Sequence, residues 1–183
     1  MNNLSQNKIL IAKPFLQDAF FRRSVILLAD HNKSGSVGFI MNRPIQIKLN
    51  DLIKEFSGAD IPVFLGGPVS QDQLFFVHPY GDKIAGSHFI GNGYFWNGDY
   101  HDLLQLSKEG EINQNKIKFL LGYSGWSSGQ LEDEIKSDSW LISDCHYQNL
   151  LRNAKQEIWR NELERIGNRY SVLSNFPSDP WMN

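Results

Sequence analysis

Ser124 is the residue whose surroundings come closest to a catalytic motif. It lies in residues 122–126, GYSGW, where G-x-S-x-G would mark the turn that presents a hydrolase nucleophile. The second glycine follows the serine directly, so the motif misses by one position. Asp144 and His146 follow in hydrolase order, but they lie only two residues apart, so we do not expect both to face one serine. A hydrolase acting through Ser124 is therefore an alternative and not the first hypothesis.

Cys145 is the other candidate nucleophile and the single cysteine of the chain. A reactive thiol needs a neighbouring cation that lowers its pKa, and no cation adjoins Cys145 in the sequence. The sequence therefore predicts an inert, packed thiol, and Cys145 stays only as the second nucleophile of the hydrolase alternative. One cysteine also excludes an intramolecular disulfide and a four-thiolate zinc site.

Two short clusters contain residue types that bind metals: Asp99, His101 and Asp102, and Asp144, Cys145 and His146. Neither cluster has two histidines at helical i, i+4 spacing or a pair of cysteines. The glycines at 122–129 suggest an anion-binding turn, but Glu132, Asp133 and Glu134 would repel a phosphate there. We therefore expect no metal and no cofactor.

Composition limits the classes of protein that the chain can belong to. The 183 residues, 41% of them hydrophobic, suffice for one domain spanning residues 1–183 with a real core. A net charge of -2 argues against a direct DNA-binding regulator, because such domains carry a basic excess and Arg22-Arg23 stands alone. The N-terminus lacks a secretory pattern, and no apolar run approaches the ~20 residues of a membrane span. We expect a cytoplasmic protein.

The elements that must position these residues follow from apolar runs and turn residues. Strands are predicted at 8–12, 24–29, 36–41, 61–65, 74–77, 116–121 and 139–142, and a hairpin at 87–96 around Asn92-Gly93. The second and third strands form a hairpin whose turn is residues 32–35. Helices are predicted at 49–56, capped by Asn50; at 100–109, capped by Asp99; after Ser127; and from Asn153 to 166. The last sixteen residues are expected to form a loop packed by its aromatic side chains.

The segment 118–135, KFLLGYSGWSSGQLEDEI, is the centre of the predicted fold. Its apolar run is expected to be a buried strand that ends at Gly122, and Ser127 with Gln130 predicts the cap of the following helix. Because hairpin-length loops join most strands, we predict an α+β fold with a largely antiparallel sheet and three to four flanking helices. Trp126 is expected to wedge the turn against that sheet as well as to form part of a site.

Four segments together resemble one family of bacterial proteins. They are residues 10–44, LIAKPFLQDAFFRRSVILLADHNKSGSVGFIMNRP; 64–79, FLGGPVSQDQLFFVHP; 119–135; and 139–142, SWLI. Their order and spacing resemble the AlgH/YqgE-like family over nearly the whole chain. The resemblance implies a partly barrel-like, closed sheet, a cytoplasmic location and uncharacterised biochemistry, with some members labelled transcriptional regulators. The family commonly has alanine at the position of Ser124, which weakens the hydrolase alternative.

The resemblance also carries over a set of characteristic positions. They are Asn42, Pro44, Gly66, Gly67, Pro68, His78, Gly122, Tyr123, Gly125, Trp126, Gly129, Gln130, Leu131 and Glu132. Apart from Leu131, and with Arg43 added, these are the candidates for a ligand- or partner-binding surface. We expect segments 42–44, 66–68 and 122–130 to converge, because strand ends commonly carry binding residues. For His78 the competing interpretation is a structural histidine.

The first functional hypothesis is accordingly a non-catalytic protein that binds a small molecule or a protein partner. An indirect regulatory role is compatible with it. The motivation is the gathering of glycine, aromatic, asparagine and histidine residues at predicted strand ends without a matched nucleophile and base.

Overall fold

The computed structural model describes residues 4–57, 60–151, 157–167 and 169–175. Its strands are β1 (Lys8–Ala12), β2 (Val25–Asn32), β3 (Gly35–Ile40), β4 (Pro44–Lys48), β5 (Pro62–Leu65), β6 (Val69–His78), β7 (His88–Gly91), β8 (Tyr94–Trp96), β9 (Lys118–Ser127) and β10 (Trp140–Asp144). The helices are α1 (Leu49–Leu52), α2 (Tyr100–Lys108), α3 (Gln130–Lys136), α4 (Tyr147–Leu150), α5 (Glu157–Ile166) and α6 (Arg169–Leu173). This mixture confirms the predicted α+β class.

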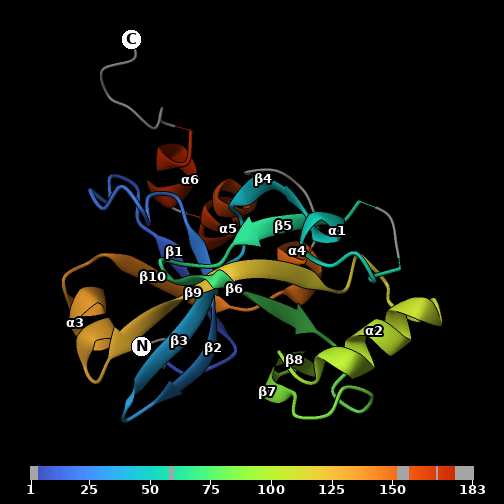
Figure 1. The fold of residues 1–183 in the computed structure, drawn as a ribbon. Coiled ribbons are helices and arrows are strands. Elements are labelled where there is room, and N and C mark those ends of the chain that lie inside the picture. The colour runs from blue at the N-terminus through green and yellow to red at the C-terminus, as the bar shows by residue number, and fades with distance from the viewer. Residues whose placement is uncertain (1–3, 58–59, 152–156, 168, 176–183) are drawn as a thin grey trace.

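All ten strands belong to one sheet, which is organised around β9. The main path runs β10-β1-β2-β3-β9-β6-β8-β7, and β4 joins it through β5. The first half of β9 pairs with β6 and, in a parallel pairing, with β5, whereas its second half pairs with β3. Figure 1 shows the β2–β3 hairpin projecting at the bottom, α3 on one side of it and α2 on the other.

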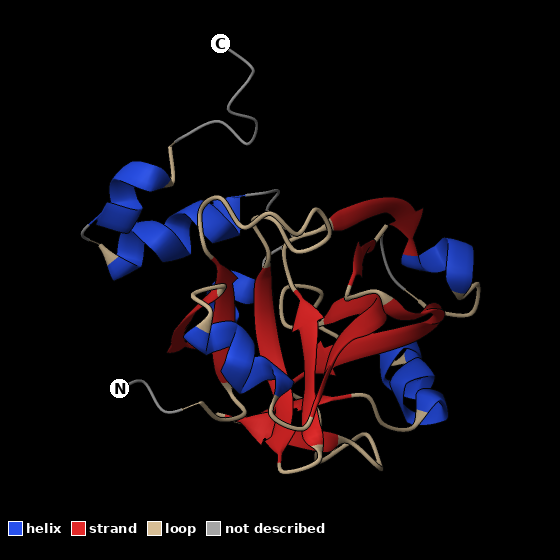
Figure 2. Cartoon of the chain, turned by 90° about the vertical axis from the view of Figure 1, so that its left-hand side faces the viewer, coloured by secondary structure: helices blue, strands red, loops and turns tan. Residues whose placement is uncertain are grey.

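The predicted closure of the sheet into a barrel is wrong. The path has two separate ends, β10 and β7, and these do not pair with each other in the described chain. Helix α5 lies against the β10 end instead: Arg165 Nη2 donates to Ser143 Oγ at 2.8 Å and to the Asp144 carbonyl at 3.3 Å. Figure 2 shows the helices around the outside of an open, strongly twisted arrangement of strands.

The buried side chains form three cores. The α5-side core contains strand residues such as Ile9, Leu27, Phe39 and Leu120, together with Tyr147, Trp159 and Leu163. The α2-side core contains Ile53, Val63, Phe76, Leu103, Leu106 and Phe119. The α3-side core contains Leu10, Ile26, Ile40, Trp126, Leu131 and Trp140. Burial of these apolar faces is the main favourable term in the stability of the fold.

Gly122 changes the direction of side chains along β9 instead of ending the strand. Leu120 lies in the α5-side core, and Tyr123, three residues later, packs against the same core, so the usual alternation is interrupted between them. Gly122 has φ +70°, which favours glycine, and the β6–β9 register shifts at this point. The prediction that the strand ends at Gly122 is therefore wrong, because a positive-φ glycine here makes a bulge.

The helix predictions were correct where a cap and a stop residue frame the pattern. Asp99 caps α2 by accepting from Asp102 N at 3.0 Å, and Gly110 follows the helix with φ +73°. Helix α3 begins later than predicted: its cap is Gly129, although Ser127 N donates to Gln130 Oε1 at 3.0 Å. The predicted Asn153 cap lies outside the described residues.

Other predicted boundaries were wrong. Residues 49–56 form only the four-residue α1, because the backbone of Ile53 is extended, with φ -131° and ψ 93°, and ends the helix. Its N-cap is Lys48 and not Asn50. The predicted three to four helices are six in the described chain, since α4 and α6 are one-turn elements without a periodic pattern. Among these described helices, none has both the length and the apolar character that a membrane crossing needs.

Candidate functional site

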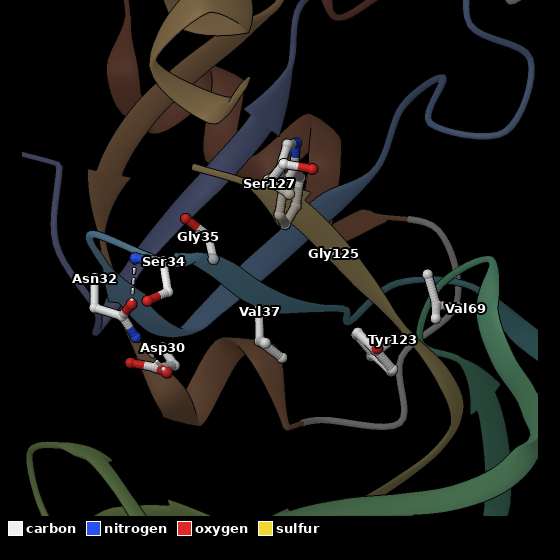
Figure 3. A pocket seen from close by; sticks show the side chains of 11 residues that line it. Asp30, Asn32, Ser34, Gly35, Val37, Val69, Tyr123, Gly125 and Ser127 are labelled. Carbon is white, nitrogen blue, oxygen red and sulfur yellow. Dashed lines mark hydrogen bonds between the residues drawn. The ribbon is translucent and has the colours of Figure 1, made fainter. Parts of the chain in front are cut away.

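An open groove of about 450 Å³ lies between the β2–β3 hairpin and the second half of β9. Eleven residues line it: Asp30, Asn32, Ser34, Gly35, Ser36, Val37, Val69, Tyr123, Gly125, Trp126 and Ser127. Figure 3 shows Asp30, Asn32 and Ser34 at one end, Tyr123 and Val69 at the other, and Val37 between them. Three of the candidate residues, Tyr123, Gly125 and Trp126, contribute to this groove, so we build the site from it.

The floor of the groove is backbone with few side chains. Gly35 pairs with Ser127 and Val37 pairs with Gly125, so glycine alternates with small side chains across β3 and β9. A Cβ on Gly35, whose φ is +140°, would lie 2.3 Å from the Trp126 carbonyl oxygen. Close approach of the two strands therefore requires glycine at 35, and the same small residues leave the sheet face open.

A carboxylate and an amide are fixed at the hairpin end of the groove. Asn32 Nδ2 donates to Asp30 Oδ2 at 3.1 Å, while Asn32 Oδ1 accepts from Ser34 N at 2.8 Å. This Asx turn closes the hairpin and orients the Asp30 carboxylate at the same time. The polar end is thus positioned by the local chemistry of the turn.

The apolar part of the groove, its middle and its opposite end, is formed by one ring and two valines. Tyr123 pairs with Val69 across β9 and β6, and Phe75 packs edge-on to the Tyr123 ring with centroids 5.6 Å apart. Val37 and Tyr123 also pack against the α5-side core. The ring is therefore supported from behind and half-exposed in front, which suits contact with an apolar or cationic group.

Trp126 points to the other face of the sheet, where α3 holds it. Its side chain is 6% exposed, and its Nε1 donates to Glu134 Oε2 at 3.0 Å. Trp140 Nε1 donates to the same oxygen at 2.8 Å, and Gln130 Nε2 donates to Glu134 Oε1 at 3.0 Å. One carboxylate thus ties two indoles to α3, and Trp126 supports the groove floor from beneath.

A serine–histidine contact lies beside this network. His31 and Ser36 pair across the hairpin, and Ser36 Oγ lies 2.8 Å from His31 Nδ1. Glu132 Oε1 of α3 lies 3.9 Å from His31 Nε2. The order Ser–His–Glu is that of a hydrolytic triad, but Ser36 is only 6% exposed and its side chain lies on the α3 face by strand alternation.

The structure gives neither sequence-predicted nucleophile a catalytic environment. Ser124 is fully buried, and its hydroxyl donates to the Gly66 carbonyl at 3.3 Å instead of to a base. Asp144 and His146 follow from β10, which three strands separate from β9. Burial raises the pKa of the Cys145 thiol to about 12, so the thiolate is strongly disfavoured.

The two clusters of metal-binding residue types have structural partners. Asp99 caps α2, and Asp102 Oδ2 accepts from Ala85 N at 2.9 Å. Asp144 pairs with Lys8 at 2.5 Å, and His146 Nε2 lies 3.0 Å from Arg165 Nη1. Within the described chain, histidine, cysteine and acidic side chains do not gather in threes suitable for a metal ion.

Three candidate segments meet at the middle of β9. The Arg43 carbonyl accepts from Leu65 N at 2.8 Å, and Gly66 N donates to the Leu121 carbonyl at 2.7 Å. A Cβ on Gly67 would lie 2.0 Å from the Tyr123 carbonyl carbon, so this glycine sits directly on β9. Asn42 connects this meeting point to the start of β2: its side chain accepts from Val25 N at 2.9 Å and donates to the Arg23 carbonyl at 2.8 Å.

These junction residues build the sheet and do not line the groove. Gly66, Gly67 and Gly122 are buried, whereas Pro44 and Pro68 are exposed outside the lining. The Arg43 guanidinium lies 5.1 Å from the Phe20 ring centroid, and burial lowers its pKa. Gly129 caps α3, and Gln130 and Glu132 belong to this helix, which packs against Trp126 through Leu131. Of the predicted site residues, the groove lining contains Tyr123, Gly125 and Trp126.

His78 lies far from the groove and has the environment of a structural histidine. It is fully buried, its Nε2 lies 2.7 Å from the Asn97 carbonyl, and its Nδ1 accepts from Tyr80 N at 3.1 Å. Burial lowers its pKa, which favours the neutral ring. Val77 pairs with Lys118, and Trp126 lies roughly 25 Å further along β9 at about 3.3 Å per residue.

Sequence reasoning missed two polar features. Lys118 is 1% exposed, and its Nζ donates to the carbonyls of Met41 at 2.8 Å and Leu150 at 2.5 Å. The same Nζ lies 4.0 Å from the centroid of the Phe64 ring. The Asp30–Asn32 end of the groove was treated only as a turn. The sequence did contain a signal: Asp30 and Asn32 follow directly after an apolar strand. Loops at strand ends often carry binding residues.

Comparison with known proteins connects this geometry to a family. The model of the family described as DUF179, AlgH-like, matches residues 9–171. A UPF0301 protein of Parabacteroides distasonis is 43% identical over 180 residues, covering 97% of this chain and 91% of the relative. A UPF0301 protein of Chlorobium limicola is 38% identical and covers 100% of this chain and 97% of the relative.

Two solved structures have the same fold. The solution structure of the AlgH protein from Pseudomonas aeruginosa matches with a TM-score of 0.75 and 28% identity, covering 97% of this chain and 98% of that one. The crystal structure of protein DIP2367 from Corynebacterium diphtheriae matches with a TM-score of 0.79 over 96% and 94% of the two chains. Its 18% identity supports the likeness of fold alone.

Proposed function

The chain belongs to the AlgH-like family, and we propose that it is a non-catalytic binding protein whose groove takes a small polar ligand. The observation that carries this proposal is the bare floor of the groove, where Gly35, Gly125 and Ser127 leave the sheet face open. Concave surfaces with a few fixed polar groups and an apolar wall are typical of ligand sites. Here Asp30 supplies the polar end and Tyr123 the apolar wall.

The chemistry of the lining favours binding over catalysis. Its carboxylate and amide groups are oriented by the hairpin, but the serine–histidine contact lies on the opposite face. The buried Ser124 and Cys145 face the protein interior. A rigid polar end and a supported ring are sufficient for recognition without a reaction. We place this binding in the cytoplasm, and an effect on gene expression would pass through a ligand or a partner.

Filling the groove floor tests the proposal. Gly125 is exposed and has no positive φ, and a Cβ there would meet the Tyr123 ring at 3.2 Å and Val69 Cγ2 at 4.0 Å. Gly125→Val therefore places a side chain between the two walls. Gln46→Val, on an exposed position of β4, is the matched control for adding valine to a strand.

The measurement is an amide-resolved NMR screen of polar metabolite mixtures against both variants and the wild type. We expect shifts at Gly35, Val37 and Tyr123 in the wild type and in Gln46→Val, and their loss in Gly125→Val. Ligand-induced shifts that survive Gly125→Val, or that map away from β3 and β9, would rule out this groove as the binding site.

Hydrolysis is a second candidate because one observation favours it, the 2.8 Å contact between Ser36 Oγ and His31 Nδ1. Ser36→Ala removes this hydroxyl, while Ser34→Ala removes an exposed hydroxyl at the tip of the same hairpin. Ester turnover that Ser36→Ala abolishes and Ser34→Ala preserves would favour an enzyme. Turnover equal in the two variants, or at the background rate in the wild type, would exclude Ser36 as a nucleophile.

A further inference from the structure

The charge of the groove lining is concentrated at one residue. Of the eleven lining residues in the described chain, Asp30 alone carries a formal charge at neutral pH. Within the part of the chain that the structure describes, no lysine, arginine or histidine forms an ion pair with Asp30. The groove therefore presents a negative charge that the described protein does not neutralise.

The Asp30 carboxylate is fixed but not saturated. Its Oδ2 accepts from Asn32 Nδ2 at 3.1 Å, and the Asn32 amide is itself held by Ser34 N. A carboxylate has about four acceptor positions, so one amide leaves capacity for a donor from a ligand. A charged donor makes the stronger hydrogen bond to a carboxylate than a neutral one does.

The rest of the groove has the dimensions of a short aliphatic chain. Asp30 pairs with Val37, and Val37 pairs with Gly125, so the row lies across three neighbouring strands. The two gaps between these strands, at about 4.8 Å each, make it roughly 10 Å long. Tyr123 lies two residues further along β9, with Val69 opposite it. A chain that starts at Asp30 would pass over Val37 and the glycine floor and end against the Tyr123 ring.

We infer that the groove selects ligands that carry a protonated aliphatic amine, with Asp30 as the counter-ion and Val37, Val69 and Tyr123 as the wall for the alkyl chain. This inference rests on the proposed binding function and adds the chemical class of the ligand. A carboxylate ligand would instead meet Asp30 as a like charge, and a neutral alcohol would lose the ion pair.

Three probes of equal chain length separate these classes: pentylamine, pentanoate and 1-pentanol. Amide-resolved NMR titrations at low salt are expected to show pentylamine binding at least tenfold tighter than either other probe, with shifts at residues 30–37 and at Tyr123. Raising the salt concentration should weaken the binding of pentylamine, because its ion pair with Asp30 is partly exposed to solvent.

Asp30→Asn keeps the shape of the side chain and removes its charge, so pentylamine affinity should fall at least tenfold. Asp82→Asn, an exposed carboxylate remote from the lining, is the matched control and should bind like the wild type. Equal binding of the three probes, tighter binding of pentanoate, or full amine affinity in Asp30→Asn would each overturn the inference. The proposed function stands or falls separately, on the Gly125→Val experiment.

Discussion

The two halves of β9 carry polar groups in opposite ways. In the first half, Lys118 is buried and donates to two backbone carbonyls, and the neighbouring His78 has hydrogen bonds on both ring nitrogens. In the second half, Tyr123, Gly125 and Ser127 face an open groove, and the polar groups around them remain accessible. The same strand is thus a closed structural element at one end and the floor of an open groove at the other.

This difference teaches that burial by the protein itself accounts for the strongly perturbed pKa values of the closed elements. Burial causes large pKa shifts at Lys118 and Cys145, which the protein itself encloses. Asp30 lies at the groove instead, on the half-exposed end of a strand. The candidate site is therefore identified by the accessibility and the fixed orientation of its polar groups.

The largest expected effect is that of Gly67→Ala, at the junction between the two halves. The added Cβ would lie 2.0 Å from the Tyr123 carbonyl carbon and 2.1 Å from its oxygen, and backbone atoms cannot move aside cheaply. We expect a loss of more than about 4 kcal/mol in the free energy of unfolding, the range reserved for severe steric defects. Chemical denaturation measures this loss, and a variant that yields no folded protein would also meet the prediction.

Gly125→Ala is the control for that experiment, because its Cβ would meet side-chain atoms and no backbone: the Tyr123 ring at 3.2 Å and Val69 Cγ2 at 4.0 Å. Its cost should stay within about 1 kcal/mol, the typical centre of point-mutant effects. Equal destabilisation by the two substitutions would contradict the distinction between a closed junction and an open floor.

Trp126→Ala is expected to cost about 3–5 kcal/mol, the usual range for truncating a buried aromatic residue. The substitution also removes the indole hydrogen bond to Glu134 and the support beneath the groove floor. Trp126→Phe should recover much of the loss, since it keeps a ring in the α3-side core. Unchanged thermal stability in Trp126→Ala would mean that the ring is not a packing element.

Lys118→Met is expected to change how the stability of the protein depends on pH. Burial lowers the pKa of Lys118 from 10.5 to about 7, so between these values the unfolded chain holds a proton that the folded protein lacks. Stability should therefore rise with pH above 7, by up to about 1.4 kcal/mol per pH unit. The two carbonyls and the Phe64 ring favour the charged form and reduce this slope.

Between pH 7 and 9 the change of stability with pH reports on Lys118. Cys145 is buried and neutral in the folded protein, and it lowers stability with rising pH only above 9.0, the pKa of the thiol in the unfolded chain. Denaturant titrations of wild type and Lys118→Met across that window are the measurement. A slope that is the same in both proteins would show that the ammonium stays protonated in the folded state.

The sequence predicted the elements with strong local signals and missed those without them. The apolar runs of β1 and β5 and the Asp99 cap of α2 were correct because each is specified locally. Strand β4 was missed because its burial alternates weakly and it begins with Pro44, which favours an edge position. The burial of Lys118 and the openness of the groove depend on how distant strands pair, which local patterns do not determine.

The smallest expected effect is that of Ser124→Ala. Its hydroxyl donates to the Gly66 carbonyl at 3.3 Å, but that carbonyl also accepts from Ile40 N at 2.8 Å, so the substitution leaves no buried acceptor unpaired. A typical net hydrogen bond is worth about 1 kcal/mol, and the loss should not exceed this. Because Ser124 faces the α3-side core and not the groove, pentylamine binding should also be unchanged. Thermal unfolding and the NMR titration measure both quantities. A loss of ligand affinity without a loss of stability would place this serine in the site after all and would extend the recognition surface through the sheet.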